Sequence, residues 1–213
     1  MTVATVQAVV PSLEPRPVSR AKRAFDVLLA CAGLALSSPL WVLVAAAIKL
    51  EDGGPVFYGQ ARVAQGGGTF RVQKFRSMVS DAERLTGAVW ASSRDPRVTR
   101  VGRLLRATAL DELPQLLSIF KGDMSLVGPR PERPEFVRQF AKDIPRYLER
   151  FGARPGLTGL AQIYGQYDSP PRRKLRYDLL YIRRQSFWLD VKLVGLSFWI
   201  TFMGRGEHRG RKL

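Results

Sequence analysis

Residues 27–48 read VLLACAGLALSSPLWVLVAAAI, and this stretch without one charged side chain decides the fold. A straight helix of 22 residues measures about 33 Å, which is enough to cross a bilayer. Pro39 interrupts it, because proline removes one backbone donor and clashes with the carbonyl of Ala35. The stretch therefore predicts either a kinked single span or a re-entrant hairpin that enters and leaves on one face; a buried core helix is a third interpretation.

The chain as a whole is strongly basic. Its 213 residues include 34 Lys and Arg against 18 Asp and Glu, a net charge of +16 that favours an anionic partner such as a membrane surface, a nucleic acid or a phosphorylated substrate. Cys31 is the single cysteine and His208 the single histidine, which argues against a disulfide framework, a thiolate zinc site and Ser-His or Cys-His catalysis. Any chemistry must therefore use carboxylates, hydroxyls, lysines and arginines.

Composition divides the chain into four parts. Residues 1–19 hold three prolines and predict a flexible leader; residues 20–50 form the membrane segment, 51–203 the body and 204–213 a basic tail. Four basic side chains before the apolar run mark its N-terminal side as cytoplasmic: Arg16, Arg20, Lys22 and Arg23.

Local patterns predict a helix-rich α+β body. Residues 56–58 and 70–75 read as a β-hairpin around a glycine run, and residues 80–85 as a short polar helix. Leucines from 104 to 117 have helical spacing up to Gly122, and helices are expected over 136–151, interrupted at Pro145, and over 172–184. Residues 187–203 are rich in aromatics and read either as a helix in the membrane interface or as an ordinary core helix.

Asp111 and Glu112 are the best candidates for chemistry. Pro114 is tolerated only in the first turn of a helix, so the helix should begin near Asp111 and place both carboxylates at its positive end. Such a place suits a phosphate or a phosphate-bound cation. The alternative is that the carboxylates, or Thr108 in a capping box, serve only as helix caps.

Two loops carry arginines on rigid turns. Residues 122–131 include Arg130, and residues 154–159 begin with Arg154. A guanidinium fork held in one orientation suits phosphate oxygens, although both loops can equally be structural, with arginines facing solvent.

Several of these motifs together carry a resemblance. They are KRAFD before the apolar run, Ser38-Pro39 within it, KFRSM at 74–78, LDELPQ at 110–115, and the segments 122–132 and 154–165. In that order the chain resembles the bacterial sugar transferase family, small monotopic polyprenyl-phosphate phosphoglycosyl transferases, over about residues 20–203.

The resemblance implies a reaction and a place. Such enzymes move a sugar 1-phosphate from a UDP-sugar to undecaprenyl phosphate, release UMP and begin the assembly of exopolysaccharide, O-antigen or glycoprotein glycans. It implies that Ser38 and Pro39 break a re-entrant membrane helix-hairpin, and that a small β-hairpin and interfacial amphipathic helices surround a catalytic domain on the cytoplasmic face of the bacterial inner membrane. The two serine hydroxyls are suitable partners for the carbonyl that Pro39 leaves without a donor.

The resemblance also implies roles for particular residues. Asp111 is expected to be the nucleophile of a covalent aspartyl-phosphosugar intermediate, with Glu112 holding Mg²⁺ together with Asp111 or taking a proton. Substrate and phosphate contacts are expected from seven residues: Lys74, Arg76, Arg130, Arg154, Gln166, Asp178 and Asp190. Gln166 stands where many relatives carry an arginine, so another cation such as Arg172 or Arg173 is a candidate to replace that charge.

Two other functions fit parts of the sequence. A membrane-anchored basic module that binds anionic lipid or nucleic acid explains the charge and the anchor but gives no reason for Asp111 and Glu112 beside Pro114. Nucleic acid is not expected as a partner, since no recognisable binding motif for it is present. An inactive relative that acts as a scaffold is opposed by the intact acidic and arginine motifs.

Overall fold

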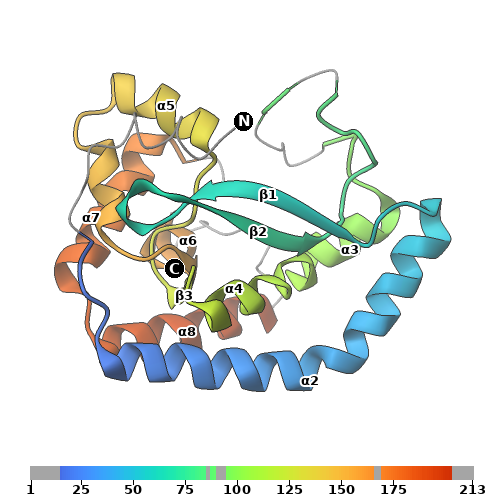
Figure 1. Cartoon of the computed structure of the whole chain (residues 1–213), viewed down its shortest axis with the longest axis horizontal. Coiled ribbons are helices and arrows are strands. Elements are labelled where there is room, and N and C mark those ends of the chain that lie inside the picture. Colours follow the sequence, from blue (N-terminus) through green and yellow to red (C-terminus); the bar gives the residue numbers. More distant parts are fainter. Residues whose placement is uncertain (1–14, 85–86, 90–94, 166–168, 203–213) are drawn as a thin grey trace.

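One long bent helix, α2 (Arg20–Asp52), runs along one side of the molecule and then turns along a second side (Figure 1). The structure is a computed structural model that describes residues 15–84, 87–89, 95–165 and 169–202. The first fourteen residues of the predicted leader, the basic tail and Gln166 lie outside the described residues. The described body is helix-rich α+β, as predicted.

Helix α2 begins and ends at defined caps. The Ser19 hydroxyl accepts a hydrogen bond from the Lys22 amide at 3.2 Å, and Gly53 ends the helix in a left-handed conformation with φ 70°. Pro39 lies inside the helix, and the Ser38 hydroxyl donates to the Ala35 carbonyl at 2.8 Å, which confirms the predicted partner for that carbonyl.

The predicted hairpin geometry of the membrane segment differs from the structure. Residues 20–52 form one continuous helix with a bend, and its two arms diverge instead of lying side by side (Figure 1). A proline inside a helix bends it without ending it when a nearby hydroxyl takes over the lost hydrogen bond, and the Ser38 contact does so here.

A β-hairpin crosses the centre of the molecule, as the sequence predicts (Figure 1). β1 (Phe57–Val63) pairs antiparallel with β2 (Thr69–Phe75), and the 3-10 turn η1 (Gln65–Gly67) joins them. The register places Lys74 opposite Tyr58, so the two side chains lie on the same face of the hairpin.

A second, smaller sheet lies where the sequence predicts only loops. β3 (Ser125–Val127) pairs parallel with β4 (Gly156–Thr158), although about thirty residues separate them. The approach requires glycine, since a Cβ added at Gly156 would lie 2.0 Å from the Gly128 amide nitrogen. Both strands are only three residues long, too short for an alternating pattern to mark them.

The other helices include most of those predicted and one further helix, Leu160–Tyr164, which was not predicted from the sequence. They are α3 (Arg100–Ala107), η2 (Leu110–Glu112), α4 (Gln115–Lys121), α5 (Pro134–Asp143), η3 (Tyr147–Gly152), α6 (Leu160–Tyr164), α7 (Pro171–Arg184) and α8 (Phe187–Phe202). Gly122 ends α4 with φ 101°, as predicted. The predicted short helix over 80–85 is wrong for its described part, because residues 80–84 form turns and Asp81 has a positive φ.

Both arms of α2 pack on the same body. Ala30 of the first arm lies in a core cluster with Leu116 and Ile119 of α4, and Val44 and Ile48 of the second arm cluster with Phe75 and Leu105. Gly33 allows the close approach of α4, since an added Cβ would lie 2.9 Å from a Leu116 methyl group.

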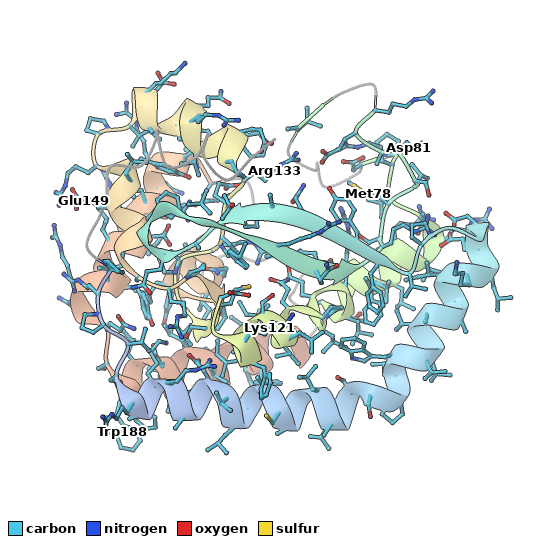
Figure 2. All side chains as sticks on the ribbon, in the orientation of Figure 1. Met78, Asp81, Lys121, Arg133, Glu149 and Trp188 are labelled. Atoms are coloured by element: carbon cyan, nitrogen blue, oxygen red, sulfur yellow. The ribbon has the colours of Figure 1, made fainter. Side chains whose placement is uncertain are left out.

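The outward side of α2 is apolar and exposed. Leu36 is 84% exposed, and α2 is long and apolar enough to cross a membrane, with 11% of its most apolar window buried. The buried-core interpretation of this segment is therefore wrong. On α8, Leu193 is buried, while Trp188 is 77% exposed and is seen at the edge of the molecule in Figure 2, which favours the interfacial interpretation of this helix.

Candidate active site

The acidic pair lies in a tight turn between two helices. Asp111 and Glu112 belong to the single 3-10 turn η2, which follows Ala109 in a left-handed conformation with φ 58°. Pro114 comes directly before α4 and is fully buried. The helix therefore begins just after the pair, close to the predicted position.

The capping interpretation of this region is wrong. Neither η2 nor α4 has a side-chain hydrogen bond at its N-cap. Thr108 ends α3, and its hydroxyl donates to the Leu104 carbonyl at 2.8 Å, so it does not cap a following helix. The two carboxylates are thus held for some other purpose than satisfying helix amides.

Glu112 is clamped by two cations from different parts of the chain. Its Oε1 atom accepts hydrogen bonds from Lys74 Nζ at 2.7 Å and from Arg130 Nη2 at 2.5 Å. Lys74 comes from β2, and Arg130 from the loop that follows β3. Burial alone would raise the pKa of Glu112, but the charges and hydrogen bonds of Arg130 and Lys74 hold it well below its usual range.

Asp111 has a different environment from its neighbour. It is 7% exposed, and Lys74 Nζ lies 3.9 Å from its Oδ2 atom. Burial raises the pKa of Asp111, and the negative charge of Glu112 adds to this effect although Lys74 opposes it. Adjacent carboxyls with pKa values pushed apart are typical of sites in which the two groups have separate chemical roles.

The donor set of the pair fits a magnesium ion that is shared with a substrate. Magnesium prefers one or two carboxylates together with phosphate oxygens and water. Lys74 and Arg130 occupy one oxygen of Glu112, so Glu112 Oε2 and the oxygens of Asp111 are the candidate ligands. Among the described residues there is no group of three or more acidic, His or Cys side chains that could form an all-protein metal site.

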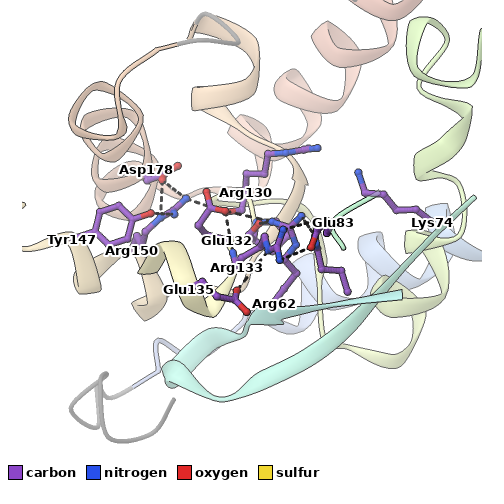
Figure 3. Close-up of polar contacts among 12 residues, drawn as sticks. Arg62, Lys74, Glu83, Arg130, Glu132, Arg133, Glu135, Tyr147, Arg150 and Asp178 are labelled. Atoms are coloured by element: carbon purple, nitrogen blue, oxygen red, sulfur yellow. Dashed lines mark hydrogen bonds and ion pairs between the residues drawn. The ribbon is translucent and has the colours of Figure 1, made fainter. Parts of the chain in front are cut away.

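The structure brings Lys74 and Arg130 to the acidic pair, and it places three other predicted site residues in ion pairs elsewhere. Arg76 is buried and pairs with Asp52 at the end of α2. Asp190 accepts from Lys22 Nζ at 2.7 Å. Asp178 forms an ion pair with Arg150, whose Nη2 atom lies 2.8 Å from Asp178 Oδ2 (Figure 3).

Arg154 is half-buried near the start of α2 and the end of α4. Burial and the charge of Arg23 lower its pKa, while Asp26 and Asp123 oppose that shift. Its Nη1 atom is buried without a hydrogen-bond partner among the described residues. No recorded contact joins Arg154 to Asp111 or Glu112 in the described part of the chain, and its predicted role in phosphate binding stays a prediction.

Sequence reasoning missed two arginines. Arg106, in the last turn of α3, donates to the Ser77 hydroxyl at 2.9 Å, and its charge lowers the pKa of Asp111. Arg150 donates to the Arg130 carbonyl at 2.9 Å. Arg106 lies five residues before Asp111, a spacing that could have drawn attention to it, whereas the partners of Arg150 are too far along the chain for any local pattern.

Fold and site together define a helix-rich α+β protein in which cations clamp an acidic pair beside an apolar, membrane-compatible helix. The family model described as "Bacterial sugar transferase" matches residues 18–204. The chain therefore belongs to the bacterial sugar transferase family.

Named relatives cover much of the chain. It is 46% identical over 187 residues to the UDP-N-acetylgalactosamine-undecaprenyl-phosphate N-acetylgalactosaminephosphotransferase of Aeromonas hydrophila. The matched region covers 86% of this chain and 44% of that relative. The chain is 45% identical over 178 residues to the UDP-glucose:undecaprenyl-phosphate glucose-1-phosphate transferase of Caulobacter vibrioides, covering 81% and 66% respectively. The exopolysaccharide production protein ExoY of Rhizobium meliloti is 38% identical over 208 residues, or 91% of each chain. The chain thus spans less than two thirds of some relatives and nearly all of another.

Proposed function

We propose that this chain transfers a sugar 1-phosphate from a UDP-sugar to undecaprenyl phosphate and releases UMP, as a first membrane step of glycan assembly such as exopolysaccharide production. The names of the relatives support the acceptor, the sugar-phosphate group and the type of reaction. The observation that carries the mechanism is the asymmetry between Asp111 and Glu112.

The asymmetry selects Asp111 as the nucleophile. Glu112 already shares one oxygen between two cations, which lowers its pKa and its basicity. The pKa of Asp111 is raised, so its ionised carboxylate is the more basic and the more nucleophilic of the two. Lys74 Nζ at 3.9 Å favours the ionised form without hydrogen bonding to it.

The reaction then follows in two displacements. An oxygen of Asp111 bonds to the sugar-linked phosphorus of the donor, and the bond from that phosphorus to the bridging oxygen breaks, so UMP leaves with the electron pair. An oxygen of undecaprenyl phosphate next bonds to the same phosphorus and releases the Asp111 carboxylate. The product is the lipid-linked diphosphate sugar, and the enzyme returns to its starting state.

Charge neutralisation makes this attack feasible, because a carboxylate and a diphosphate repel each other. Lys74 and Arg130 lie beside the pair and would stabilise negative charge on the phosphate oxygens in both displacements. Magnesium bound by Asp111 and Glu112 would supply further positive charge to the diphosphate.

The packing of α2 supports a re-entrant anchor as part of this proposal. At its first turns, Arg23 donates to the Ile119 carbonyl at 2.7 Å; at its last turn, Glu51 accepts from the Arg100 amide at 2.7 Å. A straight helix of 33 residues would separate its ends by about 50 Å. Here both ends bind one body that also holds Asp111, and this supports a site beside the lipid acceptor on the cytoplasmic face as part of the proposal.

Exposed aromatic and basic groups fit the same arrangement. Trp188, Phe198 and Trp199 of α8 are each at least 60% exposed, and the chain carries a net charge of +16. Amphipathic aromatic rings favour the membrane interface, and excess Lys and Arg attract anionic lipid head groups.

The proposal is tested by release of UMP. Purified chain, a panel of UDP-sugars and undecaprenyl phosphate in detergent should give UMP with at least one donor, and Asp111→Asn should abolish release. A variant Asp111→Asn with full activity would contradict the proposed mechanism, and a chain that only binds anionic lipid would release no UMP with any donor.

A further inference from the structure

A buried ion pair lies away from the acidic pair, between η3 and α7. Asp178 Oδ2 accepts a hydrogen bond from Arg150 Nε at 3.0 Å and forms an ion pair with Arg150 Nη2 at 2.8 Å (Figure 3). The side chains of Asp178 and Arg150 are 2% and 6% exposed. Arg150 Nη1 donates to the Tyr147 hydroxyl at 2.8 Å, and the guanidinium lies 5.2 Å from the centre of the Tyr147 ring. The guanidinium of Arg150 is therefore fixed in position.

The fixed guanidinium reaches the candidate site through the main chain of Arg130. Arg150 Nη2 donates to the Arg130 carbonyl oxygen at 2.9 Å. The preceding carbonyl, of Pro129, accepts from the Gly156 amide at 2.9 Å, so the backbone is held on both sides of the Arg130 Cα. The Arg130 side chain in turn donates to Glu112.

Stability is a poor explanation for this ion pair. Desolvation of two buried charges commonly offsets their attraction, and well-packed apolar residues in their place are often as stable. What the pair does supply is orientation, because it fixes a main-chain carbonyl next to the side chain that meets Glu112.

We propose that Arg150 and Asp178 are positioning residues that set the Arg130 guanidinium for the donor phosphates. This inference rests on the proposed function. Asp178 would act on Glu112 through three successive contacts, with Arg150 and Arg130 between them, instead of touching the substrate. Displacement of a phosphate-binding group by about 1 Å can cost about a hundredfold in rate.

A double-mutant cycle tests the link to Arg130. Asp178→Asn should lower kcat for UMP release by about ten- to a hundredfold in the native background. In an Arg130→Ala background the same change should cost less than about twofold, because the group that it positions is gone. Equal losses in both backgrounds would overturn the inference.

A matched control separates positioning from general destabilisation. Asp190 forms an equally buried ion pair with Lys22 at 2.7 Å, but its other hydrogen bond goes to the Tyr181 hydroxyl. Asp190→Asn should lower the Tm and should reduce activity by the same factor with and without Arg130→Ala. If Asp190→Asn and Arg130→Ala are as non-additive in kcat as Asp178→Asn and Arg130→Ala, the Asp178 result reports a general loss of folding. This outcome would overturn the inference.

Two further arms keep the test decisive. Tyr147→Phe removes one hydrogen bond to Arg150 and keeps the ring, so if Asp178→Asn does not fold, Tyr147→Phe should show the same dependence on Arg130 in a milder form. Thermal unfolding of the same variants needs no activity. Asp178→Asn and Glu112→Gln should shift the Tm non-additively, by about 2 °C or more, since the chain of contacts joins them.

The thermal cycle also separates this inference from the proposed function. A native chain that releases no UMP but shows the non-additive Tm shift would contradict the proposed function and support the positioning link. An active native chain with additive Tm shifts and equal kinetic losses would contradict the link alone. An inactive chain with additive Tm shifts would contradict both.

Discussion

Asp111 and Glu112 are neighbours in the chain, yet their surroundings shift their pKa values in opposite directions and suit them to different roles. Two cations hold Glu112 ionised, while burial makes the ionised form of Asp111 costly. The first group organises positive charge, and the second keeps the basicity that an attack on phosphorus needs.

Stability should respond in opposite directions to neutralising the two side chains. Because the pKa of Asp111 is raised in the folded state, its contribution to folding stability is present at low pH and is lost as pH rises through that pKa. At pH 7 the ionised Asp111 carboxylate therefore destabilises the fold, and Asp111→Asn should raise the free energy of unfolding. The lowered pKa of Glu112 means the reverse, and Glu112→Gln should cost about 1–3 kcal/mol at pH 7. Thermal unfolding of both variants measures this, and shifts of the same sign would contradict the assigned environments.

The loss of activity at low pH should follow the protonation of Asp111. Because the pKa of Asp111 is raised, UMP release should fall with decreasing pH at values above the ordinary aspartate pKa of about 3.9. The charge of Glu112 contributes to that shift, so in Glu112→Gln the residual activity should persist to lower pH. A pH–rate profile with an unmoved acid limb in Glu112→Gln would contradict the coupling.

At the scale of the elements, α2 and η2 show what local sequence could and could not predict. Pro39 and the uncharged run predicted an apolar segment interrupted at its middle, as a kinked span or a hairpin, and Gly122 and Pro114 marked the limits of α4. These signals are local, since each depends on the backbone of one segment. The divergence of the arms of α2 depends on packing against α3 and α4, which no local pattern encodes.

The candidate site was predictable where its residues belong to compact motifs. Asp111 and Glu112 stood out by type and spacing, and Arg130 by its place on a rigid turn. Lys74 was predicted only through the resemblance to the family. Asp178 and Arg150 form their ion pair across 28 residues, and β3 meets β4 through glycines about thirty residues apart. Such contacts depend on tertiary structure and leave no period in the sequence.

Two glycines in helices make an element-scale prediction. A Cβ at Gly102 of α3 would lie 2.1 Å from the Ser77 carbonyl oxygen, so Gly102→Ala should cost about 1–3 kcal/mol and loosen α3 from the end of β2. Gly195 of α8 has open space at the same position, and Gly195→Ala should instead stabilise by about 0.5–1 kcal/mol. Thermal unfolding of the two variants in one detergent compares them directly; a stable Gly102→Ala would contradict the close packing.

At the scale of the whole molecule, one body holds both ends of its apolar helix and the acidic pair. Lys22 and Asp26 join the first arm to β3 and α8, and Asp52 joins the second arm to Arg76. In the proposed re-entrant topology, the site would lie at the membrane surface and the body would stay on one side of the bilayer.

Cysteine labelling tests this topology. In a Cys31→Ser background, Arg20→Cys and Leu50→Cys lie at exposed positions near the two ends of α2, and Leu36→Cys lies at an exposed position near its middle. A membrane-impermeant maleimide should leave all three unlabelled in intact spheroplasts and should label Arg20→Cys and Leu50→Cys after lysis, with Leu36→Cys protected by lipid. Labelling of either end in intact spheroplasts would contradict a re-entrant helix.

The most direct measurement concerns the bond between Asp111 and phosphorus. Purified chain should be incubated with a UDP-sugar labelled in its sugar-linked phosphate, without acceptor, and digested for peptide mapping. We expect label on Asp111, its loss when undecaprenyl phosphate is added, and no label on Asp111→Asn. Native chain that forms the lipid-linked product without ever carrying label, or Asp111→Asn that forms it at the native rate, would contradict the account.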